Sequence, residues 1–250
     1  MEVHHHPKME HKTKRVKEYF LEFLMIFLAV SMGFFAEQLR ERQIEREREH
    51  QFISSLVTDL NDDVKALEIA IQFQKVGIGR LDSLFYLLND PDLARKNGDE
   101  LYYLARIGPR MGPFVNNNRT FEQLKNSGGF RLITNTTSSN KIMEYYGSFP
   151  LIRLLEENYN NEFLDFRRIS SKILDPGLLR RQEMADGEIA RSSDNPQLRS
   201  YDIELLKEMG FYTVHLNGTR RGILPRLENL KKDAEELIEY LEKHYELEKI

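Results

Sequence analysis

Residues 19–36 form an apolar stretch, YFLEFLMIFLAVSMGFFA, in a chain that is otherwise polar. Only Glu22 carries a charge within it. Charged residues make up 30% of the 250-residue chain, and the mean hydropathy is −0.54, so the stretch stands out from its background. A helix of this length spans about 27 Å, close to the roughly 30 Å of a bilayer's hydrocarbon core. The stretch therefore predicts a transmembrane helix at 19–36, with the lipid bilayer as its surroundings.

Two other interpretations of this stretch stay open. A basic segment, KTKRVK, precedes it, and Ala29-Val30-Ser31 has small residues at the spacing of a signal-peptide cleavage site. Against cleavage, apolar residues continue past that site to Phe35. The third interpretation is a buried helix of a soluble bundle. A membrane span accounts best for the uncharged run up to Ala36.

One side of the predicted span carries a carboxyl group and three small residues, which are Glu22, Ala29, Gly33 and Ala36. Ala29 and Gly33 have the small-xxx-small spacing that lets two helix backbones approach closely in lipid. An intramembrane carboxyl group usually faces a partner helix and not lipid. The stripe predicts a contact face, either for self-association (a homo-oligomer) or for docking on an unidentified membrane protein. The alternative is that Glu22 reaches the membrane interface and that the small residues coincide by chance.

Residues 1–18 form a basic tail that contains histidines, and we expect it to be cytoplasmic. Basic residues are almost as frequent after the span as before it, so the short length of the tail favours this orientation more than charge does. The tail histidines are of a kind that can bind a transition metal. In a tail that we expect to be disordered, we predict no functional metal site, and we predict no cofactor. These histidines are His4, His5, His6 and His11.

A charged helix follows the span at 37–76, a segment without glycine or proline. Its first part, EQLRERQIEREREHQ, has opposite charges three residues apart and few apolar residues, so it predicts a solvated stalk. From Ile53 the apolar residues recur every three or four positions, which predicts a face packed into a domain. The pattern predicts one helix from about residue 16 to residue 75, ended by Gly77 and Gly79.

Residues 77–250 are also helical in pattern, and no run of strands is expected. The sequence predicts an all-α fold in which the transmembrane helix continues into the stalk helix and an antiparallel helical bundle follows at 77–250. Within the bundle we expect a helical run to residue 90, a helix at 92–107 interrupted near Asn97-Gly98, a loop at 108–118, a helix at 121–127, a helix at 138–174 bent at Pro150, an irregular segment at 175–199 and a C-terminal helix.

A short motif marks the centre of the chain. Thr120-Phe121-Glu122-Gln123 has the form of a helix capping box, and Gly128-Gly129 supplies residues that end a helix in left-handed geometry. The layout of the chain, loosely from Lys14 onward, resembles a family of small single-span bacterial envelope proteins catalogued as a domain of unknown function. The residues that carry the likeness are Thr120, Phe121, Leu124, Ser127, Gly128, Leu132, Ile133, Ile142, Tyr145 and Tyr146.

The resemblance implies an inner (cytoplasmic) membrane protein with its domain in the periplasm, and it implies no activity. At position 129, where this chain has glycine, the family more often has a larger residue. The motif itself predicts structure: a capped helix, a glycine stop and a buried Leu132-Ile133 pair. A groove in which Thr120, Ser127 and the glycine amides hold a small polar ligand is the alternative.

No catalytic motif is present, and the chain has no cysteine. Asp59, Asp62 and Asp63 lack the glycine turn of a calcium loop, so we expect a solvated acidic face. A net charge of −4 gives no basis for a nucleic-acid partner. The tyrosine and phenylalanine positions between Tyr145 and Phe166 predict core packing.

The sequence thus predicts a non-enzymatic, single-pass envelope protein that acts as an interaction or scaffold protein. The alternative function is a sensory or small-ligand-binding helical domain, with a pocket between the loops at 108–118 and 175–199. A hydrolytic enzyme is a third hypothesis, which the missing motifs disfavour.

Overall fold

The computed structural model describes residues 16–112 and 114–247, so the histidine tract of the basic tail lies outside the described residues. Those ranges are helical, without a strand beyond an isolated bridge between Glu183 and Ile189. The chain divides into two compact units, 1–51 and 52–250. The predicted all-α class is confirmed, and each unit is described by itself.

The first helix, α1, spans Val16–Leu88 and contains both the predicted transmembrane helix and the predicted stalk. One stretch near its N-terminus is long and apolar enough to cross a membrane, and none of that stretch is buried within the chain. A core helix of a soluble bundle would bury such a stretch, so this chain alone provides no core for it.

The prediction that Gly77 and Gly79 end the first helix is wrong, because α1 continues through both to Leu88. The cost of a glycine inside a helix is only about 1 kcal/mol, and packing in a domain outweighs it. At Gly77 the missing side chain also makes room, since a Cβ there would collide with the guanidinium group of Arg220. Gly79 faces open space.

Eight shorter elements follow in the described part of the second unit. The interruption predicted near Asn97 and the loop predicted at 108–118 both occur. The single helix predicted at 138–174 is two helices that are separated at Ser148, and the segment 175–199 contains one short helix. The elements are α2 (Pro91–Lys96), α3 (Gly98–Ile107), α4 (Arg119–Asn126), η1 (Gly129–Leu132), α5 (Thr136–Gly147), α6 (Phe149–Ile173), α7 (Pro176–Arg181) and α8 (Ile203–Tyr245).

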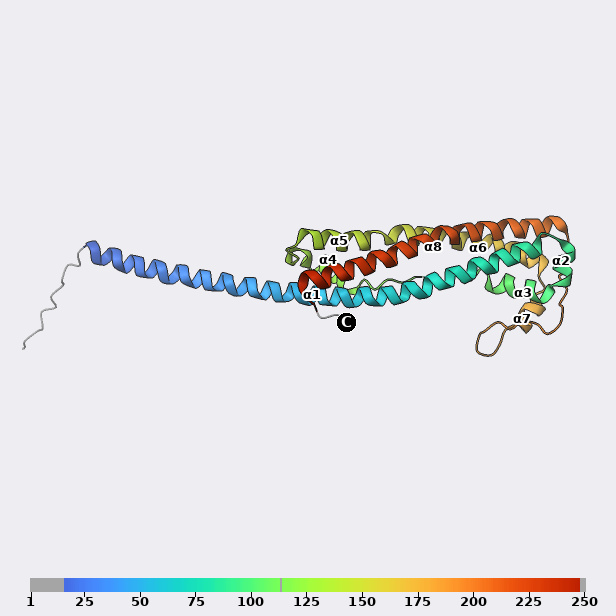
Figure 1. Ribbon diagram of the computed structural model, residues 1–250, viewed down its shortest axis with the longest axis horizontal. Helices are drawn as coiled ribbons and strands as arrows, with labels where there is room; N and C mark the ends of the chain where they lie inside the picture. Colours follow the sequence, from blue (N-terminus) through green and yellow to red (C-terminus); the bar gives the residue numbers. More distant parts are fainter. Residues whose placement is uncertain (1–15, 113, 248–250) are drawn as a thin grey trace, which may run out of the picture. The chain divides into compact units, whose positions relative to one another are not determined.

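In the second unit, α8 lies alongside α6 and the second half of α1 (Figure 1). Side-chain pairs between α1 and α8 follow a regular order. Glu68 pairs with Lys231, Lys75 with Glu228, and Asp82 with Asn217 and Arg221. The residue number on α8 therefore falls as the number on α1 rises.

The core of this unit consists of two hydrophobic clusters. The first joins α1 from Ile53 to Ala70 with α4, η1, α5, the start of α6 and the second half of α8. The second joins the end of α1 with α2, α3, the rest of α6 and the first half of α8. Met111, in the loop between α3 and α4, packs against both clusters.

Candidate functional site

Two buried carboxylates on α1 hold the segment that leads into α4. Asp59 and Asp63 are only 3% and 1% exposed, so the predicted solvated acidic face is wrong for both; Asp62 between them is exposed. One oxygen of Asp59 accepts a 3.0 Å hydrogen bond from the Thr120 amide, and the other accepts from the Arg119 guanidinium. Asp59 therefore accepts hydrogen bonds from the first two residues of α4.

Asp63 accepts two hydrogen bonds from different elements. The Asn117 amide donates at 2.6 Å, and the Tyr145 hydroxyl on α5 donates at 2.8 Å. Burial is the main cause that raises the pKa of Asp63 to about 6, and the negative charges of Asp59 and Asp62 add to it. Asp63 thus joins α1, the loop and α5.

The predicted capping box at Thr120 is wrong. Helix α4 begins at Arg119, Asn118 occupies the cap position without a side-chain hydrogen bond, and Thr120 is the second helical residue. Its free amide is satisfied by Asp59 from α1, so a distant carboxylate replaces the local cap. Such a carboxylate also interacts favourably with the N-terminal end of the helix dipole.

The structure brings three aromatic motif residues together beside these carboxylates. The rings of Phe121 and Tyr146 stack with centroids 4.2 Å apart, and Tyr145 meets Tyr146 edge-to-face. The Tyr146 hydroxyl donates to the Asn117 carbonyl at 3.2 Å. Phe121, Tyr145 and Tyr146 therefore pack around the segment that Asp59 and Asp63 hold.

The other motif residues lie along the same core cluster or at its surface. Leu124 and Ile133 are buried in it, while Leu132 is only half-buried. Ser127 and Gly128 are exposed. Gly128 has a φ of 68°, so the predicted left-handed helix stop is confirmed there.

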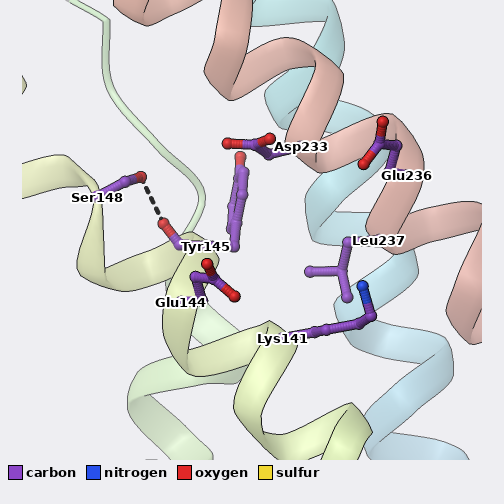
Figure 2. Close-up of a pocket in the computed structure, with 7 residues that line it drawn as sticks. All are labelled: Lys141, Glu144, Tyr145, Ser148, Asp233, Glu236 and Leu237. Carbon is purple, nitrogen blue, oxygen red and sulfur yellow. Dashed lines mark hydrogen bonds between the residues drawn. The ribbon is translucent and has the colours of Figure 1, made fainter.

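A cavity of about 350 Å³ opens between α5 and α8, and Tyr145 forms part of its wall (Figure 2). Figure 2 shows the Asp233 carboxylate above the phenol ring of Tyr145. The Ser148 hydroxyl donates a 2.7 Å hydrogen bond to the Tyr145 backbone carbonyl. Burial, and then the Glu236 charge, raise the pKa of Asp233. The residues that line the cavity are Lys141, Glu144, Tyr145, Ser148, Asp233, Glu236 and Leu237.

Chemically, this cavity offers the carboxylates of Glu144, Asp233 and Glu236 and the ammonium group of Lys141, while the Tyr145 hydroxyl already donates to Asp63. Burial raises the pKa of Tyr145, and the nearby Asp63 charge adds to that effect, so the hydroxyl stays protonated at neutral pH. Within residues 16–112 and 114–247, no three His, Asp or Glu side chains are grouped so as to hold a metal ion.

A buried arginine lies between the two hydrophobic clusters. Arg220 on α8 is 0% exposed. Its guanidinium group donates to Gln74 at 2.9 Å, to the Tyr159 hydroxyl at 3.0 Å, and to the backbone carbonyls of Gly108 and Arg110. All four acceptors are neutral, and the two carbonyls belong to the start of the loop after α3. Arg220 therefore fixes that loop to α1, α6 and α8.

A second cavity, of about 440 Å³, lies where the two predicted loops approach each other. Arg110 from the first loop and Leu179 from the second both line it. The remaining lining comes from α3, from α6 and from Leu174 just beyond it: Ala105, Arg106, Phe163, Phe166, Arg167, Ser170, Ser171 and Leu174. The arginines of this cavity were not singled out from the sequence.

The predicted membrane contact stripe lies in the first unit. Ala29, Gly33 and Ala36 are exposed and Glu22 is half-buried. A Cβ added at Gly33 would meet nothing within 4 Å, so the chain itself leaves that position open for another helix.

Comparison with known proteins finds no matching family model, no matching curated protein and no matching solved structure.

Proposed function

We propose that this protein is a single-pass, non-enzymatic interaction or scaffold protein of the bacterial inner membrane. Its N-terminal helix spans the bilayer, with the tail in the cytoplasm and the helical domain, an antiparallel bundle, in the periplasm. The protein self-associates or docks on another membrane protein. The observation that carries the proposal is the apolar stretch of α1, which is long enough to cross a membrane and is wholly unburied in the chain.

Three further features support this proposal. Open space at Gly33 leaves room for a second helix backbone on the stripe that also carries Glu22. The falling order of partners along α8, from Lys231 to Asn217, is the order that an antiparallel pair with α1 requires. The resemblance to single-span bacterial envelope proteins is the basis for assigning the helix to the inner membrane and the domain to the periplasm.

Self-association is tested by crosslinking in intact membranes. The chain has no cysteine, so a single cysteine at Arg40, on the same side of the helix as Gly33, reports contact between two copies by disulfide formation. Gly33→Leu is expected to reduce the dimer band strongly, because a large side chain separates the backbones. Ser31→Leu changes a small residue on the opposite side and is the matched control.

A monomer band alone, or a dimer band that Gly33→Leu leaves intact, would show that this stripe does not mediate self-association. A larger band of another size would indicate docking on a partner, and purification from detergent extracts would then identify that protein.

Orientation is tested with a membrane-impermeant maleimide. A cysteine at Met184, an exposed position between α7 and α8, is expected to react in intact spheroplasts. Reaction only after lysis would place the domain in the cytoplasm and contradict the periplasmic assignment.

A specific observation favours a second candidate function, small-ligand binding. The 440 Å³ cavity lies beside both loops that the sequence associates with a pocket, and its volume is in the range of ligand sites, about 300–1,000 Å³. Saturation-transfer NMR against a small-molecule library tests this function, and an absence of any ligand that contacts the cavity would contradict it.

A further inference from the structure

The 440 Å³ cavity combines positive charge with apolar walls. Three of its lining residues are arginines, from three different segments: Arg106 on α3, Arg110 in the following loop and Arg167 on α6. The chain as a whole is acidic, with a net charge of −4, so three arginines around one cavity are a local departure from its composition.

These arginines differ in how far they are already engaged. Arg106 forms an ion pair with Glu183 and donates to the Leu179 carbonyl at 2.8 Å. Arg110 and Arg167 are exposed and take part in no ion pair within the described ranges. The Arg167 guanidinium lies 5.8 Å from the centre of the Phe163 ring. Two arginines are thus free to pair with an incoming anion.

The position of Arg110 is fixed before any ligand arrives. Its backbone carbonyl accepts a hydrogen bond from the buried Arg220, as does the Gly108 carbonyl. The Pro109 carbonyl between them accepts from Tyr159 at 2.8 Å. An anion that binds Arg110 therefore does not have to order its backbone first, which lowers the entropic cost of binding.

Much of the remaining lining is apolar. Phe163, Phe166, Leu174 and Leu179 contribute to it, and Phe166 and Leu174 are only 2% and 3% exposed. The hydroxyl groups of Ser170 and Ser171 already donate to backbone carbonyls on α6, at 2.7 and 2.8 Å. Arginine guanidinium groups pair with carboxylate or phosphate groups, and apolar side chains favour contact with hydrocarbon. A ligand that fits this site therefore has both an anionic group and an apolar body.

We propose that this cavity binds a small molecule with one anionic group, a carboxylate or phosphate, and an aromatic or aliphatic body. The anionic group pairs with Arg110 and Arg167, and the body packs on Phe163, Phe166 and Leu174. This inference rests on the second candidate function, small-ligand binding, and is independent of the contact stripe in the first unit.

The test compares three probes of one shape and different charge: 3-phenylpropanoate, neutral 3-phenylpropan-1-ol and cationic 3-phenylpropylamine. Binding to the full chain in phosphatidylcholine nanodiscs is measured by saturation-transfer NMR, with empty nanodiscs as the background for partitioning. The carboxylate is expected to bind at least about 10-fold more tightly than the alcohol or the amine, because only the carboxylate forms an ion pair with the arginines.

Arg110→Gln and Arg167→Gln are each expected to weaken carboxylate binding about 10-fold. Arg131→Gln, in η1 and outside the cavity, removes the same charge and is expected to leave binding unchanged. Loss of Arg110 leaves the hydrogen bonds of its backbone to Arg220 in place, and Arg167 provides a second, independent variant. Inorganic phosphate as a competitor reports whether the anionic group alone is recognised.

Equal affinity for the three probes, or carboxylate affinity that neither substitution changes, would overturn the anion-binding inference while small-ligand binding stands. If none of the three probes binds, the candidate function of this cavity fails together with the inference.

Discussion

The hydroxyl group of Tyr145 on α5 donates a 2.8 Å hydrogen bond to Asp63 on α1, across 82 positions of sequence. The same tyrosine forms part of the wall of the cavity between α5 and α8. One side chain therefore contributes both to the wall of that cavity and to the hydrogen bonds of Asp63.

Replacing Tyr145 with phenylalanine is expected to lower the free energy of unfolding by about 2 kcal/mol at neutral pH, because a buried carboxylate loses a donor. Urea denaturation of the full chain in detergent, followed by circular dichroism, measures this. Tyr86→Phe removes the same hydroxyl group from an exposed position of α1 and is expected to cost less than about 0.5 kcal/mol. Equal effects of the two substitutions would contradict a structural role for the bond.

Stability is expected to depend on pH through Asp63. Its pKa is about 6 in the folded protein, against an ordinary value of 3.8, so the native state binds the proton more tightly than the unfolded chain. The contribution of this group is therefore greatest below about pH 4 and is lost as the pH rises to about 6. The full change corresponds to about 3 kcal/mol.

Asp63→Asn removes this titration, and Asp62→Asn, at an exposed neighbouring position, is the control. The stability of the unsubstituted protein relative to Asp63→Asn is expected to fall between pH 4 and pH 7, whereas the difference from Asp62→Asn stays nearly constant. Parallel stability curves for all three proteins would show that the pKa of Asp63 is not raised.

The helical class, most helix boundaries and the aromatic core followed from periodicity, but the buried polar residues did not. Buried positions on α1 recur every three or four residues, and some of them carry polar side chains that the apolar pattern does not include. Asp63 is one of them, while its neighbour Val64 is half-buried and packs against the first hydrophobic cluster. The polar residues at buried positions of α1 and α8 are Glu49, Asp59, Asp63, Gln74, Thr213, Asn217 and Arg220.

These exceptions to the apolar pattern could have been recognised in the sequence as polar residues at positions where the three-and-four repeat requires a buried side chain. A polar residue at a core position needs a partner, and the partners lie on other elements, such as Tyr145 for Asp63 and Gln74 for Arg220. A single sequence indicates that such a partner must exist and does not identify it. For the same reason the two cavities could not be predicted residue by residue, since each is lined by segments distant in sequence.

Arg220 is expected to be essential for stability, whereas its neighbour Arg221 is not. Arg220→Met leaves the carbonyls of Gly108 and Arg110 and the side chain of Gln74 without their donor, at an expected cost of about 3 kcal/mol. Arg221 forms an exposed ion pair with Asp82, so Arg221→Met is expected to cost less than about 1 kcal/mol. Both are measured by urea denaturation, and a stable Arg220→Met protein would show that the hydrogen bonds of Arg220 are dispensable.

Two glycines in α1 give a matched test of the packing around Arg220. Alanine has the higher helix propensity, so Gly79→Ala, at a position facing open space, is expected to stabilise the fold by up to about 1 kcal/mol. Gly77→Ala gains the same propensity but forces its methyl group against the Arg220 guanidinium, which four hydrogen bonds hold in place. A net loss of about 1–3 kcal/mol is expected there, as for overpacking of a core. Thermal unfolding of the two variants compares them directly, and a stabilising Gly77→Ala would mean that Arg220 can move aside at little cost.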